Sequence, residues 1–322
     1  MASILRCVAA LMLALAAPLT NSQGWPVKPV RIILPNAAGA TNDILTRALV
    51  EPLSKALGQP IIVENRVGAD GIIGTEACVR AAADGYALCG TASNVIIWNT
   101  VLRPKLPYDV LRDLAPVLHA GFFDSVLAVH PSVPVTTLQQ LLDHAKANPG
   151  KVNWGHFGVN STGNMYMEWL NRSKNAQFYP VPYKTQPQNV QALLAGETSV
   201  SLGSFNNFGQ FLKTGKLRAL AVTSARRADH LPNVPTFEEL GIKLPLRTWF
   251  GYHYPSATPQ ELVLRMNGEL RKILDSTAFK SNVLDRISVS ANTGTPEQFD
   301  RYIREQIRAV TELVAYIGLK PQ

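Results

Sequence analysis

The sequence has few cysteines, few charged residues and few aromatic residues for its length. It holds three cysteines in 322 residues, with 17% charged and 8% aromatic side chains. So few cysteines exclude a small domain held together by disulfides, and so little charge excludes a disordered chain. The apolar content of 46% is typical of a globular protein with a substantial core. The length predicts about two domains.

Long apolar runs are also rare, and the longest lies at the very start of the chain. The segment MASILRCVAALMLALAAPLT contains one basic residue, Arg6, followed by an apolar run that ends in small residues. This is the pattern of a signal peptide, and it is too short to cross a membrane as a helix. We expect residues 1–24 to be removed on export, with the mature chain in the periplasm of a Gram-negative source.

Cleavage of that segment would leave two cysteines, Cys78 and Cys89. In an oxidising compartment such a pair favours a disulfide, because two thiols alone cannot complete a tetrahedral zinc site. Cys78 falls in a helical stretch and Cys89 in the strand-like ALCGT, with the turn ADGY between them. Two free buried thiols are the alternative reading.

Motifs for catalysis and for nucleotide binding are missing. The sequence has no GxSxG, HExxH or GxxxxGK[ST] pattern. We therefore expect no catalytic residues, no bound metal and no cofactor. The formal charge of +8 is spread along the chain without an arginine-rich arm, which argues against nucleic acid as a partner and leaves attraction of anions as one use.

What the sequence does contain is an alternation of short β-branched runs with longer helical segments. Apolar runs at 30–34, 60–65 and 87–91 each precede a helical pattern, and a second series runs from 125 to 223. The strand-like RTWFGYHY (247–254) and two helical segments, 259–276 and 296–317, follow. We predict an α/β fold of two lobes, residues 25–122 plus 246–322 and residues 123–245, each a mainly parallel sheet flanked by helices.

Two loops between a strand and a helix stand out as ligand sites. They are PNAAGATND (35–43) and GHFGVNSTGN (155–164). Unpaired N–H groups at a helix start favour an anion, so two facing loops would hold a carboxylate. We expect Thr41 or Asn42 to cap the first helix, Asp43 to repel an anion placed too near, and Ser161 and Thr162 to be available as donors. For the first loop, a plain turn between strand and helix is the alternative. For His156, a general base is the alternative to a hydrogen bond with the ligand.

Between Trp25 and Gln322 the sequence contains a series of motifs that resemble, in the same order, those of a known protein family. The motifs include WPVKPVRIILP (25–35), LGQPIIVENRVGADGIIGTE (57–76), NPGKVNWG (148–155) and GKLRALAVTSARR (215–227). With these segments the chain resembles the Bug family, the TctC-like extracytoplasmic solute receptors of tripartite tricarboxylate transporters.

The resemblance implies a periplasmic binding protein of Venus-flytrap form, similar to type II, that closes on a small organic acid anion and is not an enzyme. It implies the membrane permease subunits of the transporter as partners and a monomeric receptor. A receptor that signals to a membrane sensor is an alternative, and a carboxylate-ester hydrolase is a more distant one. Carried onto this chain, the ligand-binding residues are Asn36, Ala38, Gly39, Ala40, Thr41, Asn42, Asp43, Ser93, Asn94, His156, Val159, Asn160, Ser161, Thr162, Ser204 and Asn206.

The chain also departs from the family pattern, and the departures bear on the ligand. Asn36, Ala37 and Ala38 stand where the family's first loop usually has Phe-Pro-Pro, which makes the loop more polar. The second loop has His156, Val159 and Asn160 in place of a run of serine and glycine, and GSFNN (203–207) lacks the family's aspartate. We hypothesise an aromatic or dicarboxylic acid as ligand, with His156 as a specificity contact.

Overall fold

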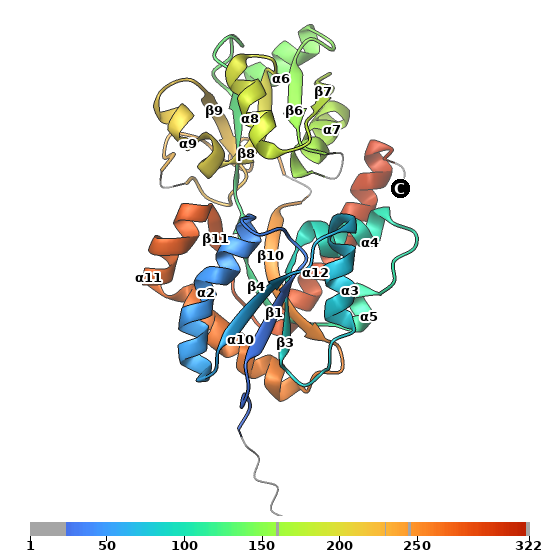
Figure 1. Ribbon diagram of the computed structural model, residues 1–322. Helices are drawn as coiled ribbons and strands as arrows, with labels where there is room; N and C mark the ends of the chain where they lie inside the picture. The colour runs from blue at the N-terminus through green and yellow to red at the C-terminus, as the bar shows by residue number, and fades with distance from the viewer. Residues whose placement is uncertain (1–23, 159–160, 229, 244–245, 320–322) are drawn as a thin grey trace, which may run out of the picture.

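Two β-sheets flanked by helices form the two lobes of the computed structural model (Figure 1). The structure describes residues 24–158, 161–228, 230–243 and 246–319. The signal peptide expected over residues 1–24 therefore lies outside the described residues, except for Gly24. The predicted two-lobed α/β architecture is confirmed.

The first lobe holds a six-stranded sheet in the order β11-β4-β10-β3-β1-β2. Its strands are β1 (Val30–Leu34), β2 (Ile61–Asn65), β3 (Ala87–Ala92), β4 (Leu114–Phe123), β10 (Thr248–Pro255) and β11 (Val289–Ala291). The helices of this lobe are α2 (Thr41–Leu57), η1 (Ala69–Gly71), α3 (Ile72–Val79), η2 (Asn94–Trp98), α4 (Asn99–Leu102), α5 (Val110–Asp113), α10 (Gln260–Asp275), α11 (Thr277–Phe279), η3 (Lys280–Leu284), η4 (Asp285–Ile287) and α12 (Pro296–Ile317).

The second lobe holds a five-stranded sheet in the order β7-β6-β8-β5-β9. Its strands are β5 (Ser125–Val129), β6 (Asn153–His156), β7 (Tyr179–Pro182), β8 (Val200–Ser204) and β9 (Arg218–Val222), and its helices are α6 (Leu138–Ala147), α7 (Thr162–Lys174), α8 (Gln186–Ala195) and α9 (Phe205–Lys213). In the part of the chain that is described, no helix has the length and apolarity needed to span a bilayer.

The prediction that each sheet is mainly parallel is wrong. In the first sheet β1 pairs in parallel with β2 and β3, but β10 runs antiparallel to both β3 and β4, and β11 runs antiparallel to β4. In the second sheet β5 runs antiparallel to β8 and β9. The chain crosses from the first lobe to the second between β4 and β5, and it returns just before β10. These three strands run antiparallel to their neighbours, and for that reason both sheets are mixed.

Local sequence signals explain where the principal helices begin and end. Helix α2 ends at Gly58, which takes a left-handed φ of 69° that an L side chain adopts only under strain. Helix α12 begins with a capping box, in which Thr295 and Gln298 each bind the other's backbone N–H, and Pro296 occupies its first turn. These signals fix the helices that flank the first sheet.

Cys78 and Cys89 form a disulfide, as the sequence predicted. Cys78 lies in α3 and Cys89 in β3, with a Cα–Cα distance of 5.8 Å, which is typical of such bonds. Both residues are buried. The bond ties α3 to the central part of the first sheet, close to the strand that leads into Ser93.

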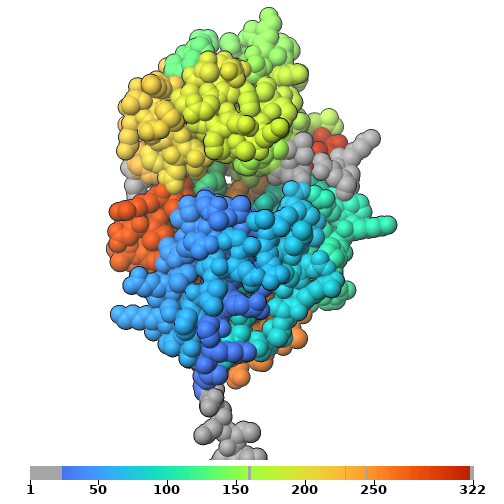
Figure 2. Space-filling model, viewed as in Figure 1, coloured from blue at the N-terminus to red at the C-terminus, as the bar shows by residue number. Residues whose placement is uncertain are grey.

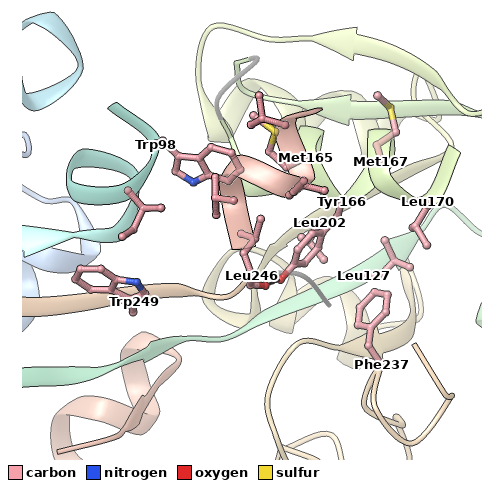
Figure 3. Close-up of a cluster of buried hydrophobic side chains, with 14 of the residues drawn as sticks. Trp98, Leu127, Met165, Tyr166, Met167, Leu170, Leu202, Phe237, Leu246 and Trp249 are labelled. Carbon is pink, nitrogen blue, oxygen red and sulfur yellow. Dashed lines mark hydrogen bonds between the residues drawn. The ribbon is translucent and has the colours of Figure 1, made fainter. Parts of the chain in front are cut away.

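One hydrophobic cluster extends from the first lobe into the second. Figure 3 shows Trp98 and Trp249 of the first lobe on one side and Met165 and Tyr166 of the second lobe on the other, with Leu246 between them. The hydroxyl of Tyr166 donates to the backbone carbonyl of Leu246. Leu246, where the chain returns from the second lobe to the first, is therefore packed against both.

Two buried histidines make the stability of the protein dependent on pH. Burial lowers the pKa of His119 to about 3, and burial likewise lowers the pKa of His253 to about 3. In the unfolded chain each titrates near 6.5, so between about pH 6.5 and pH 3 the unfolded state binds more protons than the folded state. The stabilisation is complete above pH 6.5 and is lost as the pH falls.

We expect the free energy of unfolding to fall by about 1.4 kcal/mol per pH unit for each of these histidines below pH 6.5. Urea unfolding at pH 7, 6, 5 and 4 measures this slope. His119 lies among the rings of Phe122, Trp249, Phe299 and Tyr302. The variant His119→Phe should therefore fold and show a slope smaller by about 1.4 kcal/mol per unit. An identical slope in the variant and the natural chain would contradict this account.

Candidate functional site

The two predicted ligand loops follow the carboxyl ends of parallel strands, where ligands usually bind in such sheets. In the first lobe β1 and β3 are parallel neighbours, with Ile33 opposite Cys89. The loop that starts at Pro35 and the residues Ser93 and Asn94 therefore emerge at the same edge of the sheet. In the second lobe β6 and β8 are parallel neighbours too, so residues 157 and 158, which follow β6, and α9, which follows β8, emerge at the same edge.

The first loop ends in a helix start with open backbone donors. Ala40 is the N-cap residue of α2 and makes no side-chain cap, so the expectation that Thr41 or Asn42 caps this helix is wrong. The N–H groups of Thr41, Asn42 and Asp43 have no hydrogen-bond acceptor among the described residues. Three parallel donors at the positive end of the helix dipole favour a bound anion.

Asp43 shapes this loop. Its carboxylate accepts hydrogen bonds from the Gly39 N–H at 2.9 Å, from Arg47 Nε at 3.0 Å and from Asn65 Nδ2 at 2.9 Å. Burial raises the pKa of Asp43, but the hydrogen bonds from Arg47, Gly39 and Asn65 outweigh it and leave the pKa below the usual value. The expected repulsion of a nearby anion is therefore reduced, because the Arg47 cation is paired with the carboxylate.

Amide side chains connect the first loop to the end of β3. Asn42 is buried and donates through Nδ2 to the Asn36 side-chain oxygen at 3.0 Å and to the Thr91 carbonyl at 3.4 Å. Ala38 and Gly39 are exposed, and a Cβ added to Gly39 would meet no atom within 4 Å. The small residues of this loop thus leave the backbone open to solvent, while Asn42 anchors it.

His156 lies at the second loop, although in a different position from the one expected. It is the last residue of β6 and not a loop residue, and it is 3% exposed. Burial lowers the pKa of His156, and the hydrogen bond from Nδ1 to the Gly158 carbonyl at 3.0 Å opposes this lowering. A carbonyl can only accept, so Nδ1 carries the proton and a neutral imidazole presents Nε2 as an acceptor.

Ser161 and Thr162 are engaged within the protein, which corrects the expectation that both are available donors. Ser161 caps α7, since its hydroxyl donates to the Gly158 carbonyl at 2.7 Å and accepts from the Asn164 N–H. The Thr162 hydroxyl bonds the Thr248 hydroxyl at 2.7 Å. The backbone N–H groups of Thr162 and Gly163 have no acceptor among the described residues, so the second loop offers backbone donors instead.

Thr248 and its neighbour connect the two lobes at this point. Thr248 bonds Thr162 of the second lobe. The next residue, Trp249, donates its backbone N–H to the Ser93 hydroxyl of the first lobe at 3.3 Å. Residues 248 and 249 thus touch a candidate residue in each lobe. The sequence alone did not point to Thr248, because a hydroxyl at the start of a strand carries no pattern of its own.

The third group of candidates follows β8. Ser204 is buried, pairs with Ser125 of β5 and makes no side-chain cap, whereas Asn206 is exposed in the first turn of α9. Gln186, at the start of α8, places its amide over Gly203 and has no hydrogen-bond partner in the described structure for either amide atom. It was missed because glutamine at a helix start is common.

Not every predicted residue can be placed. Val159 and Asn160 lie outside the described residues. Asn94 is exposed as the first residue of η2. Within the described ranges, no cluster of three or more His, Cys, Asp or Glu side chains could hold a metal ion. The candidate site can therefore bind a ligand through hydrogen-bond donors at the starts of two helices, α2 and α7.

A model of known receptors matches most of this chain. The "Tripartite tricarboxylate transporter family receptor" model, TctC, covers residues 45–319. The chain belongs to this family of solute receptors. Among its relatives, Protein BugT of Bordetella pertussis is 32% identical over 311 residues, covering 95% of this chain and 94% of BugT.

Two solved structures that contain an organic acid have the same fold as this chain. One is R. palustris Rpa4515 with adipate, with a TM-score of 0.80 and 27% identity, covering 93% of this chain and 100% of that one. Another is MatC from Rhodopseudomonas palustris with bound malate, with a TM-score of 0.73 and 26% identity, covering 90% and 100%. The similarity extends over nearly the whole chain, so this protein has the fold of these structures and belongs to the family of solute receptors.

Proposed function

We propose that the mature protein is a periplasmic receptor that captures a small organic acid between its lobes and delivers it to the membrane permease subunits of a tripartite tricarboxylate transporter. In this proposal residues 25–122 with 246–322 and residues 123–245 are the units that close on the ligand. The protein binds its ligand without chemical conversion, and the signal peptide at 1–24 directs its export.

One observation carries the proposal. Open backbone donors at the start of α2 and of α7 belong to opposite lobes, and residues 248–249 contact both Thr162 of the second loop and Ser93, which follows β3 in the first lobe. Each charge-assisted hydrogen bond contributes about 1.5–3 kcal/mol. Four or five such bonds support micromolar affinity, about 8 kcal/mol, after the costs of ordering and desolvation.

The ligand class follows from these donors and from the relatives. Rpa4515 has adipate in its structure and MatC has malate, and both molecules carry carboxylates. His156 adds a specificity contact, because its neutral Nε2 accepts a hydrogen bond and thus suits a hydroxyl or a water that bridges to the ligand.

A thermal-shift screen of mono-, di- and tricarboxylates, aliphatic and aromatic, tests the proposal. An acid present at 100 times its dissociation constant should stabilise the protein by about 2.7 kcal/mol. The variant His156→Ala should lose affinity for some acids of the panel more than for others. Absence of any stabilising acid, or turnover of a bound acid derivative, would contradict the receptor function, and equal affinities in His156→Ala would remove His156 from the site.

A further inference from the structure

A cavity of about 290 Å³ lies between the two lobes, beside the crossing strands. Its walls come from β5, α9 and the residues after β9 in the second lobe and from η4 and β11 in the first. Figure 1 shows α9 above β11 and α11, and in Figure 2 the yellow residues of the second lobe lie directly over the orange-red residues of the first. A group bound here would contact both lobes.

Two buried hydroxyls in this cavity have no partner. Ser224, after β9, and Ser288, before β11, are each 7% exposed, and the Oγ atom of each lacks a hydrogen-bond partner in the described structure. Both residues line the cavity, one from each lobe, and each Oγ atom is itself enclosed by protein atoms. A buried hydroxyl without a partner is unfavourable, so a ligand atom that bonds it contributes to affinity.

The charged residues of the cavity wall are poorly suited to a carboxylate. Arg227 donates through Nε to both carboxylate oxygens of Glu239, and neither Arg226 nor His230 is free. The acidic residues Asp124 and Asp285 also line the cavity. A second carboxylate placed here would meet acidic side chains and cations that are already engaged.

The rest of the wall suits an apolar group of ring size. Val126, Val222 and Val289 line the cavity, and so does Phe205, whose ring contacts that of His230 at a tilt of 40° with centroids 3.6 Å apart. Apolar walls with a few fixed polar groups are the usual composition of a small-molecule pocket.

The cavity adjoins the third group of candidate residues. Phe205 directly follows Ser204, and Ser125, which lines the cavity, is the β-sheet partner of Ser204. The cavity therefore lies next to Ser204, and Ser224 and Ser288 are on its wall.

We propose that this cavity binds the uncharged body of the ligand, an aromatic ring with a hydroxyl that bonds Ser224 and Ser288, so that the receptor prefers hydroxyaromatic monocarboxylates to aliphatic dicarboxylates. This inference rests on the proposed receptor function. The carboxylate stays with the backbone donors of α2 and α7, and the ring fills the space between the valines.

Titration calorimetry with 4-hydroxybenzoate, 3-hydroxybenzoate, benzoate and adipate tests this assignment. We expect at least one hydroxybenzoate to bind the natural chain at least 10-fold more tightly than adipate. Ser224→Ala should weaken binding of that hydroxybenzoate about 10-fold and change benzoate by less than 2-fold, because only the hydroxyl loses a partner. Ser224→Leu, which fills the cavity, should weaken both aromatic acids, and Ser281→Ala on the exposed surface of η3 is the matched control.

Adipate bound as tightly as the hydroxybenzoates, or Ser224 variants that leave every affinity unchanged, would overturn the assignment while the receptor function stands. Failure of every acid to bind the natural chain would overturn both. Circular dichroism of each variant separates loss of binding from loss of fold.

Discussion

Replacement of Asp43 by alanine is expected to weaken binding of the acid ligand at least 10-fold and to lower the free energy of unfolding by about 2–3 kcal/mol. Asp43 is 2% exposed, and its carboxylate holds Gly39, Arg47 and Asn65 together. Without it the loop from Asn36 to Ala40 loses the bond that fixes Gly39, so the donors at the start of α2 are no longer held in place.

Two variants separate the role of Asp43 from general damage. Asp43→Asn keeps one acceptor oxygen but removes the charge that pairs with Arg47, so an intermediate loss is expected. Glu51→Ala, on the exposed face of the same helix, should leave both affinity and stability unchanged. Calorimetry and urea unfolding measure the two effects, and full affinity in Asp43→Ala would show that loop geometry is not set by this carboxylate.

Replacement of Trp249 by alanine is expected to lower the free energy of unfolding by about 3–5 kcal/mol. Its ring is fully buried and packs against Phe299 with centroids 5.2 Å apart and against His119 at 5.8 Å. The residue also donates its N–H to Ser93 beside the site. Loss of the ring leaves a cavity where the chain returns from the second lobe to the first.

Trp249→Phe is the matched control for this variant. A phenyl ring keeps most of the apolar volume and the same backbone donor, so the loss should be less than half that of alanine. Chemical denaturation followed by circular dichroism measures both. A loss below about 1 kcal/mol for Trp249→Ala would contradict the role of this side chain in packing the crossing segment.

Periodicity and end signals in the sequence were sufficient to predict most helices and parallel strands. Helix α12 begins at Pro296 and ends at Ile317 in the structure, as its apolar spacing and its proline indicated. Strand β4 was not predicted, because Leu114–Phe123 contains a single β-branched residue and also includes Pro116 and Gly121, which are unfavourable in strands. Its place in the sheet depends on pairing with β10, and irregular register near Pro116 accommodates the proline.

The candidate site was predictable as two loops but not as a set of contacts. Small residues before a helix indicated the backbone donors of Thr41 to Asp43. The bridge from Thr162 to Thr248 joins residues 86 positions apart, and the hydroxyls of Ser224 and Ser288 meet at one cavity only through the packing of two lobes. Such long-range contacts leave no local signal in a single sequence.

If backbone donors from both lobes hold the carboxylate of the ligand, replacing that carboxylate by an uncharged group should weaken binding. Titration calorimetry of the mature chain should compare the tightest acid of the panel with its primary amide, which has nearly the same shape but no charge. Charge-assisted hydrogen bonds are about twice as strong as neutral ones, so the amide should bind about 100-fold more weakly. Equal affinity for the acid and the amide would contradict the account.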